Sequence, residues 1–158
     1  MINHVEIARG FFELGMIEDA FAELENLGEE AADMMEVIRL KADMLIEQKR
    51  WNEAFQMSQR LCESEPRGVQ GYIHAAYCLH EMERTSDACD LLLAGPLHLR
   101  EEPIWLYNLG CYHAVLGKHE DAADYLEKSF LLDPTLRETA KSDPDLEPLW
   151  GQFMQESG

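Results

Sequence analysis

The sequence predicts an all-α protein, an α-solenoid of stacked antiparallel helix pairs followed by a short C-terminal capping helix. Two observations support this prediction: the sequence repeats with a period of 34 residues, and each repeat contains two stretches of helical hydrophobic spacing joined by a short turn. Turns this short join antiparallel helices. Because one helix pair cannot bury both of its faces, neighbouring pairs are expected to stack.

Three columns define the repeat when the sequence is aligned with itself at a shift of 34. Small residues fill the first column, which contains Ala8, Ala42, Ala76 and Gly110. Alanine fills the second column, at Ala20, Ala54, Ala88 and Ala122. The acidic column directly before it contains Asp19, Glu53, Asp87 and Asp121. The chain therefore divides into four repeats without insertions, at residues 1–34, 35–68, 69–102 and 103–136.

Each column has a physical reason. Small residues let two helix backbones approach closely where the helices of a pair cross. The acidic residues fall in the first turn of each second helix, where a carboxylate faces the positive end of the helix dipole. Gly117-Lys118 supplies the turn of the fourth repeat, and Asp133-Pro134 ends its second helix. In the third repeat Gly95-Pro96 is expected to end the second helix early, leaving an irregular link up to Glu102.

Residues 137–158 do not continue the period and are predicted to form a capping segment. This segment reads as a short helix, a turn at Ser142-Asp143-Pro144 and a final helix. One face of the final helix carries Leu146, Leu149, Trp150 and Phe153, spaced for burial. The segment is expected to cover the apolar flank of the last repeat, because a solenoid needs a terminal cap for solubility.

Composition excludes several classes of partner. Lys and Arg number 13 against 31 Asp and Glu, a net charge of -18. Such a chain repels nucleic acid and anionic membranes.

The sequence also predicts where the protein is found. No apolar stretch is long enough to span a membrane and no secretory signal precedes the first repeat, so a cytoplasmic protein is expected. The four cysteines lack metal-site spacing and are expected to be buried free thiols, without a metal or cofactor.

No sequence motif of an enzyme is present. The patterns of phosphate-binding loops, dinucleotide-binding folds, zinc proteases and serine hydrolases are all missing. The many carboxylates fall mostly on predicted solvated helix faces, where charge runs usually serve only solvation. The sequence therefore predicts a protein without catalytic activity.

The repeats resemble the tetratricopeptide repeat family, most closely in the fourth, IWLYNLGCYHAVLGKHEDAADYLEKSFLLDP. The family's signature is matched by Leu109-Gly110, Gly117, Ala122, Leu126 and Pro134. Its second alanine is replaced by Leu27, Leu61, Gly95 and Ser129, and the third repeat has Arg100 in place of the closing proline. The resemblance implies a right-handed superhelix of about eight repeat helices. The capping segment also resembles the end segment that follows many bacterial arrays of this family.

By this resemblance, the first helix of each pair lines a concave groove that binds a peptide or an extended protein segment. The groove residues expected from the family's positions are Val5, Arg9, Phe12, Arg39, Asp43, Ile73, Tyr77, His80, Tyr107 and Cys111. Tyr77 and Tyr107 are expected to contribute most, since tyrosine is favoured at interfaces. The acidic balance suggests a neutral or basic partner. Arg9 and Arg39 either hold a partner's carboxylate or pair with Glu13, Glu36 or Asp43.

Two other functions stay open. The array can instead self-associate as a homodimer through its first repeat, which is rich in Phe11, Phe12, Met16 and Phe21. One basic and nine acidic residues within the first 34 oppose that contact. The acidic chaperones of type III secretion translocators are a weaker alternative, because they usually have three repeats and no such cap. Adaptors that clamp chaperone tails are disfavoured, since the expected lysines are missing.

The alanine column gives a direct test of the predicted helix crossing. Ala88→Leu and Ala122→Leu add bulk where two helices are expected to meet, so each is expected to lower the free energy of unfolding by ~1–3 kcal/mol. Thermal unfolding measures the effect. An unchanged midpoint in both variants would contradict the predicted crossing.

Overall fold

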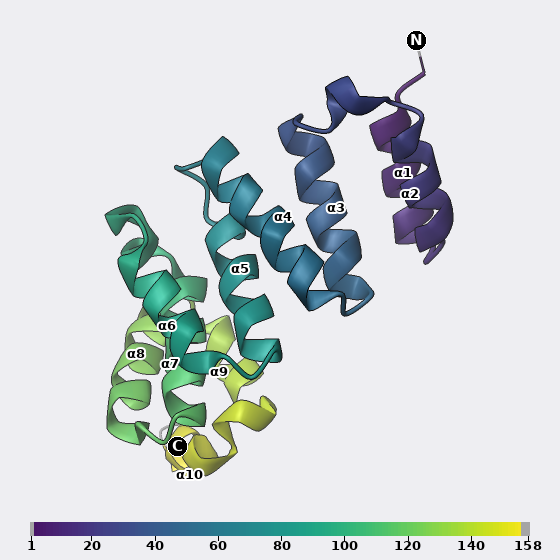
Figure 1. The fold of residues 1–158 in the computed structure, drawn as a ribbon. Coiled ribbons are helices and arrows are strands. Elements are labelled where there is room, and N and C mark those ends of the chain that lie inside the picture. Colours follow the sequence, from purple (N-terminus) through teal and green to yellow (C-terminus); the bar gives the residue numbers. More distant parts are fainter. Residues whose placement is uncertain (1, 156–158) are drawn as a thin grey trace. The chain divides into compact units, whose positions relative to one another are not determined.

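The computed structural model describes residues 2–155, and all regular elements in that range are helices (Figure 1). The first four α-helices are α1 (His4–Glu13), α2 (Ile17–Glu25), α3 (Met35–Glu47) and α4 (Trp51–Ser64), with the 3-10 helix η1 (Glu29–Ala31) between α2 and α3. The next four α-helices are α5 (Gln70–Glu81), α6 (Thr85–Ala94), α7 (Pro103–Val115) and α8 (His119–Leu132). The chain ends with α9 (Thr135–Ala140), the 3-10 helix η3 (Pro144–Leu149) and α10 (Trp150–Gln155). Two compact units divide between Cys78 and Leu79, within α5.

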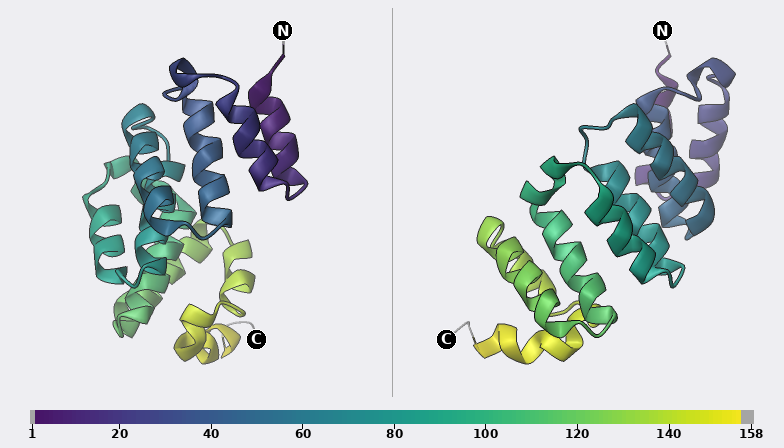
Figure 2. Two further views of the ribbon diagram at one scale, coloured as in Figure 1. Left: turned by 45° about the vertical axis from the view of Figure 1, so that its right-hand side comes forward. Right: turned by 60° about the vertical axis from the view of Figure 1, so that its left-hand side comes forward.

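The predicted antiparallel pairs are present within each unit. In the first unit α1 packs on α2 and α3 packs on α4, and in the second unit α7 packs on α8 (Figure 2). Val5, Leu24, Val37, Leu40 and Met44 are buried together in the core of the first unit. The all-α fold class is thus confirmed, and so is the pairing of helices in the first, second and fourth repeats.

All four turns between paired helices share one backbone motif at the same repeat position. Gly15, Lys49, Glu83 and Gly117, spaced 34 residues apart, adopt positive φ angles of 78, 58, 62 and 79°. In the last turn, the N–H of Lys118 donates to the carbonyl of His113 at 2.8 Å and that of Gly117 to Ala114 at 3.0 Å. This is the Schellman arrangement that satisfies the last carbonyls of a helix. Lys and Glu tolerate the strained φ because the tertiary pairing fixes the turn.

The small columns lie where the paired helices approach. Ala20, Ala54, Ala88 and Ala122 are fully buried, as are Ala8, Ala42 and Ala76. A Cβ atom placed on Gly110 would lie 2.6 Å from Cγ of Leu126 and 3.3 Å from the carbonyl oxygen of Ala122. The backbones of α7 and α8 are therefore close enough that only glycine fits at position 110.

Two expected segments differ from the structure. The link after α6 contains the 3-10 helix η2 (Leu97–Glu101), which buries Leu99 completely, so it is more regular than predicted. At the C-terminus, Leu146 and Leu149 are buried as expected but belong to η3, and the α-helical turn begins only at Trp150. Pro148 explains the change, because proline removes an N–H that an α-helix needs. The side chain of Phe153 lies outside the described residues.

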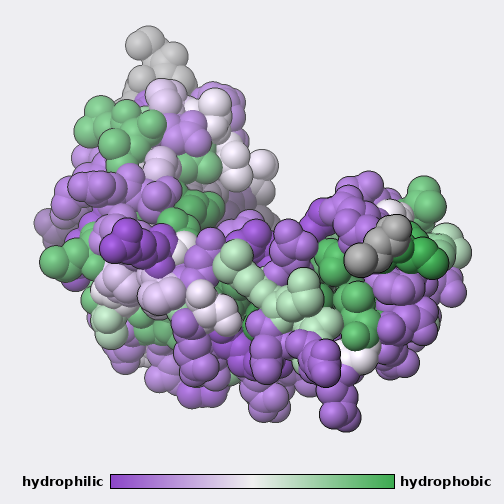
Figure 3. All heavy atoms as spheres, turned by 90° about the horizontal axis from the view of Figure 1, so that it is seen from above, coloured by the Kyte–Doolittle hydropathy of each residue, from purple (hydrophilic) through white to green (hydrophobic). Residues whose placement is uncertain are grey.

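The surface is mostly hydrophilic, with separate hydrophobic patches (Figure 3). The most exposed large apolar side chains include Ile2, Leu14, Leu97 and Leu131. Isolated apolar side chains of this kind are ordinary on protein surfaces. Among the described residues, no helix has the length and apolar character needed to cross a membrane.

Two glycines inside helices give opposite predictions. Gly10→Ala meets nothing within 4 Å, so it is expected to stabilise α1 by ~0.5–1 kcal/mol through the higher helix propensity of alanine. Gly110→Ala forces Leu126 away and is expected to destabilise the protein by ~1–3 kcal/mol. Urea unfolding of both variants measures the difference. Stabilisation by both substitutions would show that α7 and α8 do not meet as closely as described.

Candidate protein-binding surface

In the first unit, the first helices of the pairs bring together charged groups from α1, α3 and α5. Nδ1 of His74 lies 3.7 Å from Oδ1 of Asp43. Burial raises the pKa of Asp43, and the positive charges of His74, Arg39 and Arg9 oppose that shift. Burial lowers the pKa of His74, and the Asp43 carboxylate opposes it. The charges of Arg9, Arg39, Asp43 and His74 thus interact across three helices. The first three are predicted groove residues, and His74 follows the predicted groove residue Ile73.

Both arginines of this surface are paired within the chain, but not with the expected carboxylates. Arg9 donates to Oε1 of Glu6 at 2.6 Å, one turn away on α1. Arg39 donates to Oε2 of Glu65 at 2.6 Å, at the end of α4. Glu13, Glu36 and Asp43 were the carboxylates expected if the arginines pair within the chain. Surface pairs of this kind contribute little stability.

Tyr77 is the most accessible aromatic residue among the predicted groove positions, with 37% of its surface exposed. Its ring makes an edge-on contact with Trp51 at the start of α4, with centroids 5.6 Å apart. Phe12 and Ile73 are half-buried, whereas Val5 is buried in the core of the first unit. Val5 therefore supports the surface from beneath.

In the second unit, the predicted groove residues are covered by the capping segment. Tyr107 and Cys111 are only 5% and 4% exposed. The Tyr107 hydroxyl donates to Oδ2 of Asp143 at 2.8 Å, and Sγ of Cys111 donates to the same oxygen at 3.6 Å. Burial, reinforced by the nearby negative charge of Asp143, raises the pKa of both Tyr107 and Cys111. Both groups therefore stay protonated and act as hydrogen-bond donors.

His80 also contacts the capping segment. Its Nε2 lies 3.2 Å from Oδ2 of Asp145, and its Nδ1 lies 2.9 Å from the hydroxyl of Thr85. Its ring stacks at a tilt on Tyr112, with centroids 4.8 Å apart. Asp143 and Asp145 were missed as contact residues by sequence reasoning. The only local signal was Asp143 before Pro144, which is typical of a helix start and which accepts from the N–H of Asp145.

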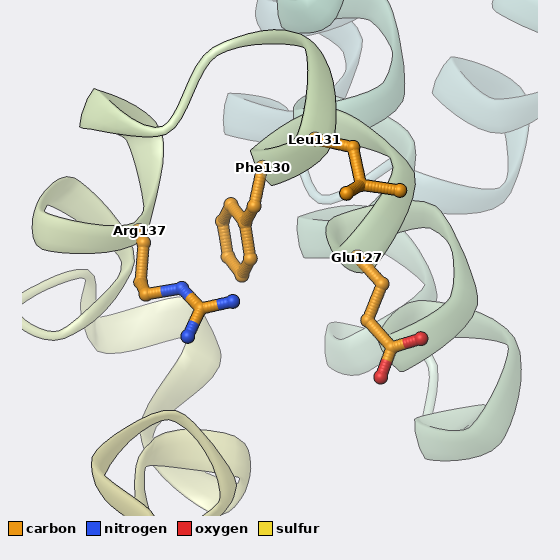
Figure 4. A pocket seen from close by; sticks show the side chains of 4 residues that line it. All are labelled: Glu127, Phe130, Leu131 and Arg137. Carbon is orange, nitrogen blue, oxygen red and sulfur yellow. The ribbon is translucent and has the colours of Figure 1, made fainter. Parts of the chain in front are cut away.

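A small surface pocket lies between α8 and α9, away from the predicted groove positions (Figure 4). Its lining consists of Glu127, Phe130, Leu131 and Arg137. The guanidinium of Arg137 lies over the Phe130 ring, 5.3 Å from its centroid. This is a structural cation–π contact without the convergent polar groups of an active site.

The cysteines form no metal site within the described part of the chain. Cys78, Cys89 and Cys111 are buried and Cys62 is half-buried, and none of the four forms a disulfide. Burial raises the pKa of Cys62 and of Cys89 to about 11, which keeps both thiols protonated and unreactive near neutral pH. Residues 2–155 contain no group of three or more side chains placed to hold a metal ion.

Comparison with known proteins agrees with the geometry of the helix pairs. Residues 103–136, the pair α7 and α8, match the family model of the tetratricopeptide repeat. This segment is therefore similar to a tetratricopeptide repeat. Repeats of this family generally serve as protein–protein interaction modules rather than as enzymes.

Solved structures of MamA share the all-α fold of this chain. MamA MSR-1 superposes with a TM-score of 0.70 and 18% identity, over 84% of this chain and 76% of that one. The MamA RS-1 ArsTM double mutant gives a TM-score of 0.72 and 16% identity, over 89% of this chain and 76% of that one. At this identity the likeness concerns the fold. No curated protein matches the sequence significantly.

The shifted pKa of His74 predicts a pH dependence of stability. Because the folded state holds this pKa below its unfolded value of about 6.5, the unfolded state binds the proton more readily, and stability falls as pH drops from 7.5 to 5.5. His74→Gln is expected to lose less stability over this range than the wild type. Urea unfolding at both pH values measures this, with His119→Gln at an exposed position as the control. An unchanged pH dependence in His74→Gln would contradict the prediction.

Proposed function

We propose that this protein is a non-catalytic interaction module that binds an extended protein segment on the first-unit surface. This surface is defined by Arg9, Phe12, Arg39, Asp43, Ile73 and Tyr77. The carrying observation is that these residues are exposed or half-buried, whereas Tyr107 and Cys111 in the second unit are covered by the chain's own capping segment. The first-unit residues are therefore accessible to a partner, whereas Tyr107 and Cys111 are not.

The chemistry of the surface suits an extended segment with mixed side chains. Tyr77 offers an aromatic face with a polar tip, and Trp51 holds the ring from its edge. Arg39 and Asp43 keep more than a third of their side-chain surface exposed. A partner's basic group pairs with Asp43 and its acidic group with Arg39, each replacing a weak internal contact. The overall negative charge still favours a neutral or basic segment.

Self-association is a second candidate, favoured by exposed apolar residues on the first helix pair. Ile7 and Leu14 of α1 and its turn, and Met16 before α2, are exposed. The acidic charge of the first repeat opposes a contact between two copies there. The crosslinking experiment below separates the two functions, because a second copy of the chain gives a product of known mass.

Photo-crosslinking tests the proposed surface directly. A photoreactive phenylalanine analogue replaces Tyr77 in the full chain, and the matched control carries it at Gln56 on the exposed face of α4. We expect the photoreactive group at position 77 to capture a heterologous protein from the source lysate that the control at position 56 does not capture. Products shared equally by both positions would contradict the proposed surface, and a product made only of two copies would establish self-association instead.

The captured product also yields a quantitative control. Arg39→Glu is combined with the photoreactive group at position 77. This substitution reverses a charge on the first-unit surface, so the yield of crosslinked product is expected to change several-fold. Arg84→Glu, an exposed charge at the start of α6 that pairs locally with Asp87, serves as a charge-matched control and is expected to leave the yield unchanged. Equal effects of both variants would mean that net charge alone controls capture.

A further inference from the structure

The capping segment lies on the same face of the repeats that the family positions assign to ligand binding. Within the second unit, η3 packs against α7 (Figures 1 and 2). Tyr107 and Cys111 occupy the repeat positions that Arg39 and Asp43 occupy two repeats earlier. Residues 143–149 therefore sit on α7 where a partner segment would sit.

The contacts of this segment combine polar recognition with apolar anchoring. Asp143 accepts hydrogen bonds from the Tyr107 hydroxyl and the Cys111 thiol, and Asp145 contacts Nε2 of His80. The next residue, Leu146, is fully buried, and Leu149 is nearly so. Two carboxylates separated by one residue and followed by a leucine are thus bound by a phenol, a thiol and an imidazole.

We propose that this face of the second unit, defined by His80, Tyr107 and Cys111, is a second protein-binding surface with its own specificity. Its partner is an acidic segment of the form Asp-x-Asp-Leu, and residues 143–146 are its internal occupant. The proposal is independent of the first-unit surface, because it concerns other residues and a partner of opposite charge preference.

The donor set explains why an acidic segment is accepted by an acidic protein. The partners of Asp143 are neutral groups, and hydrogen bonds to a charged acceptor are stronger than those between neutral groups. Burial keeps Tyr107 and Cys111 protonated, so each has a hydrogen to donate. The general repulsion from a chain of net charge -18 weakens binding of an external acidic segment, and salt screens that repulsion.

The internal occupant competes through its effective concentration. A tethered segment that spans its site acts at an effective concentration on the order of millimolar, so an external segment must exceed that value or bind more tightly. Weakening the tethered contacts therefore opens the surface to external segments. The capping segment then controls access to α7 as well as covering it.

Peptide binding to the full-length chain tests the proposal. The probe is a fluorescein-labelled peptide of residues 141–150, and the control peptide has alanine in place of both aspartates. Asp143→Ala/Asp145→Ala in the protein removes the polar contacts of the internal occupant. This released variant is expected to bind the probe at least tenfold more tightly than the wild type does. It is expected to bind the control peptide at least tenfold more weakly than the probe.

Further measurements separate recognition from a purely structural cap. Tyr107→Phe added to the released variant is expected to weaken probe binding, and raised salt is expected to strengthen it. A released variant that stays folded by circular dichroism yet binds neither peptide, or binds both equally, overturns the proposal.

If the released variant does not fold, hydrogen exchange on the wild-type protein tests the proposal instead. With the probe at millimolar concentration, amides of residues 143–149 are expected to exchange faster, because the external peptide displaces the internal segment. Exchange at these amides that is unaffected by the probe overturns the proposal.

Discussion

The close approach of the two helices in each pair is the constraint on which the rest of the structure depends. In the pairs α1–α2, α3–α4 and α7–α8, an alanine lies on one side of the crossing and an alanine or glycine on the other, all of them buried. Gly110 shows how tight the contact is, since a Cβ there would lie 2.6 Å from Cγ of Leu126. The turn between the two helices is constrained together with the crossing. All four turns therefore have a positive φ at the same repeat position, although only two of them have glycine there.

Because the crossing fixes the scaffold, the remaining positions of the first helices are free to vary in chemistry. Position 9 of the repeats is occupied in turn by Arg9, Asp43, Tyr77 and Cys111. The first three lie at exposed or half-buried places, and the fourth donates to Asp143. One backbone framework thus offers a charged and aromatic surface in the first unit and a set of neutral donors in the second. Interaction specificity in such a protein is a property of these positions and not of the fold.

The capping segment has two roles that rest on different contacts. Leu146 and Leu149 are buried, and the Trp150 indole donates to the carbonyl of Ala140 at 2.8 Å, which holds the segment together as a cap. Asp143 and Asp145 contribute little apolar burial and instead direct carboxylates at Tyr107, Cys111 and His80. Apolar contacts of the first kind stabilise without regard to sequence detail, whereas directional hydrogen bonds of the second kind select particular groups.

The sequence by itself determined the helix pairs, because their signals are local: a 34-residue period, small residues at the crossings, and turn and cap residues at fixed offsets. It also predicted the burial of Leu146 and Leu149. Only the tertiary structure decided that Tyr107 and Cys111 are covered by residues more than 30 positions away, and that Arg39 pairs with Glu65 rather than a nearer carboxylate. Helical spacing specifies which side of a helix a residue occupies, but the partner on that side depends on how distant segments pack, and spacing carries no information about that.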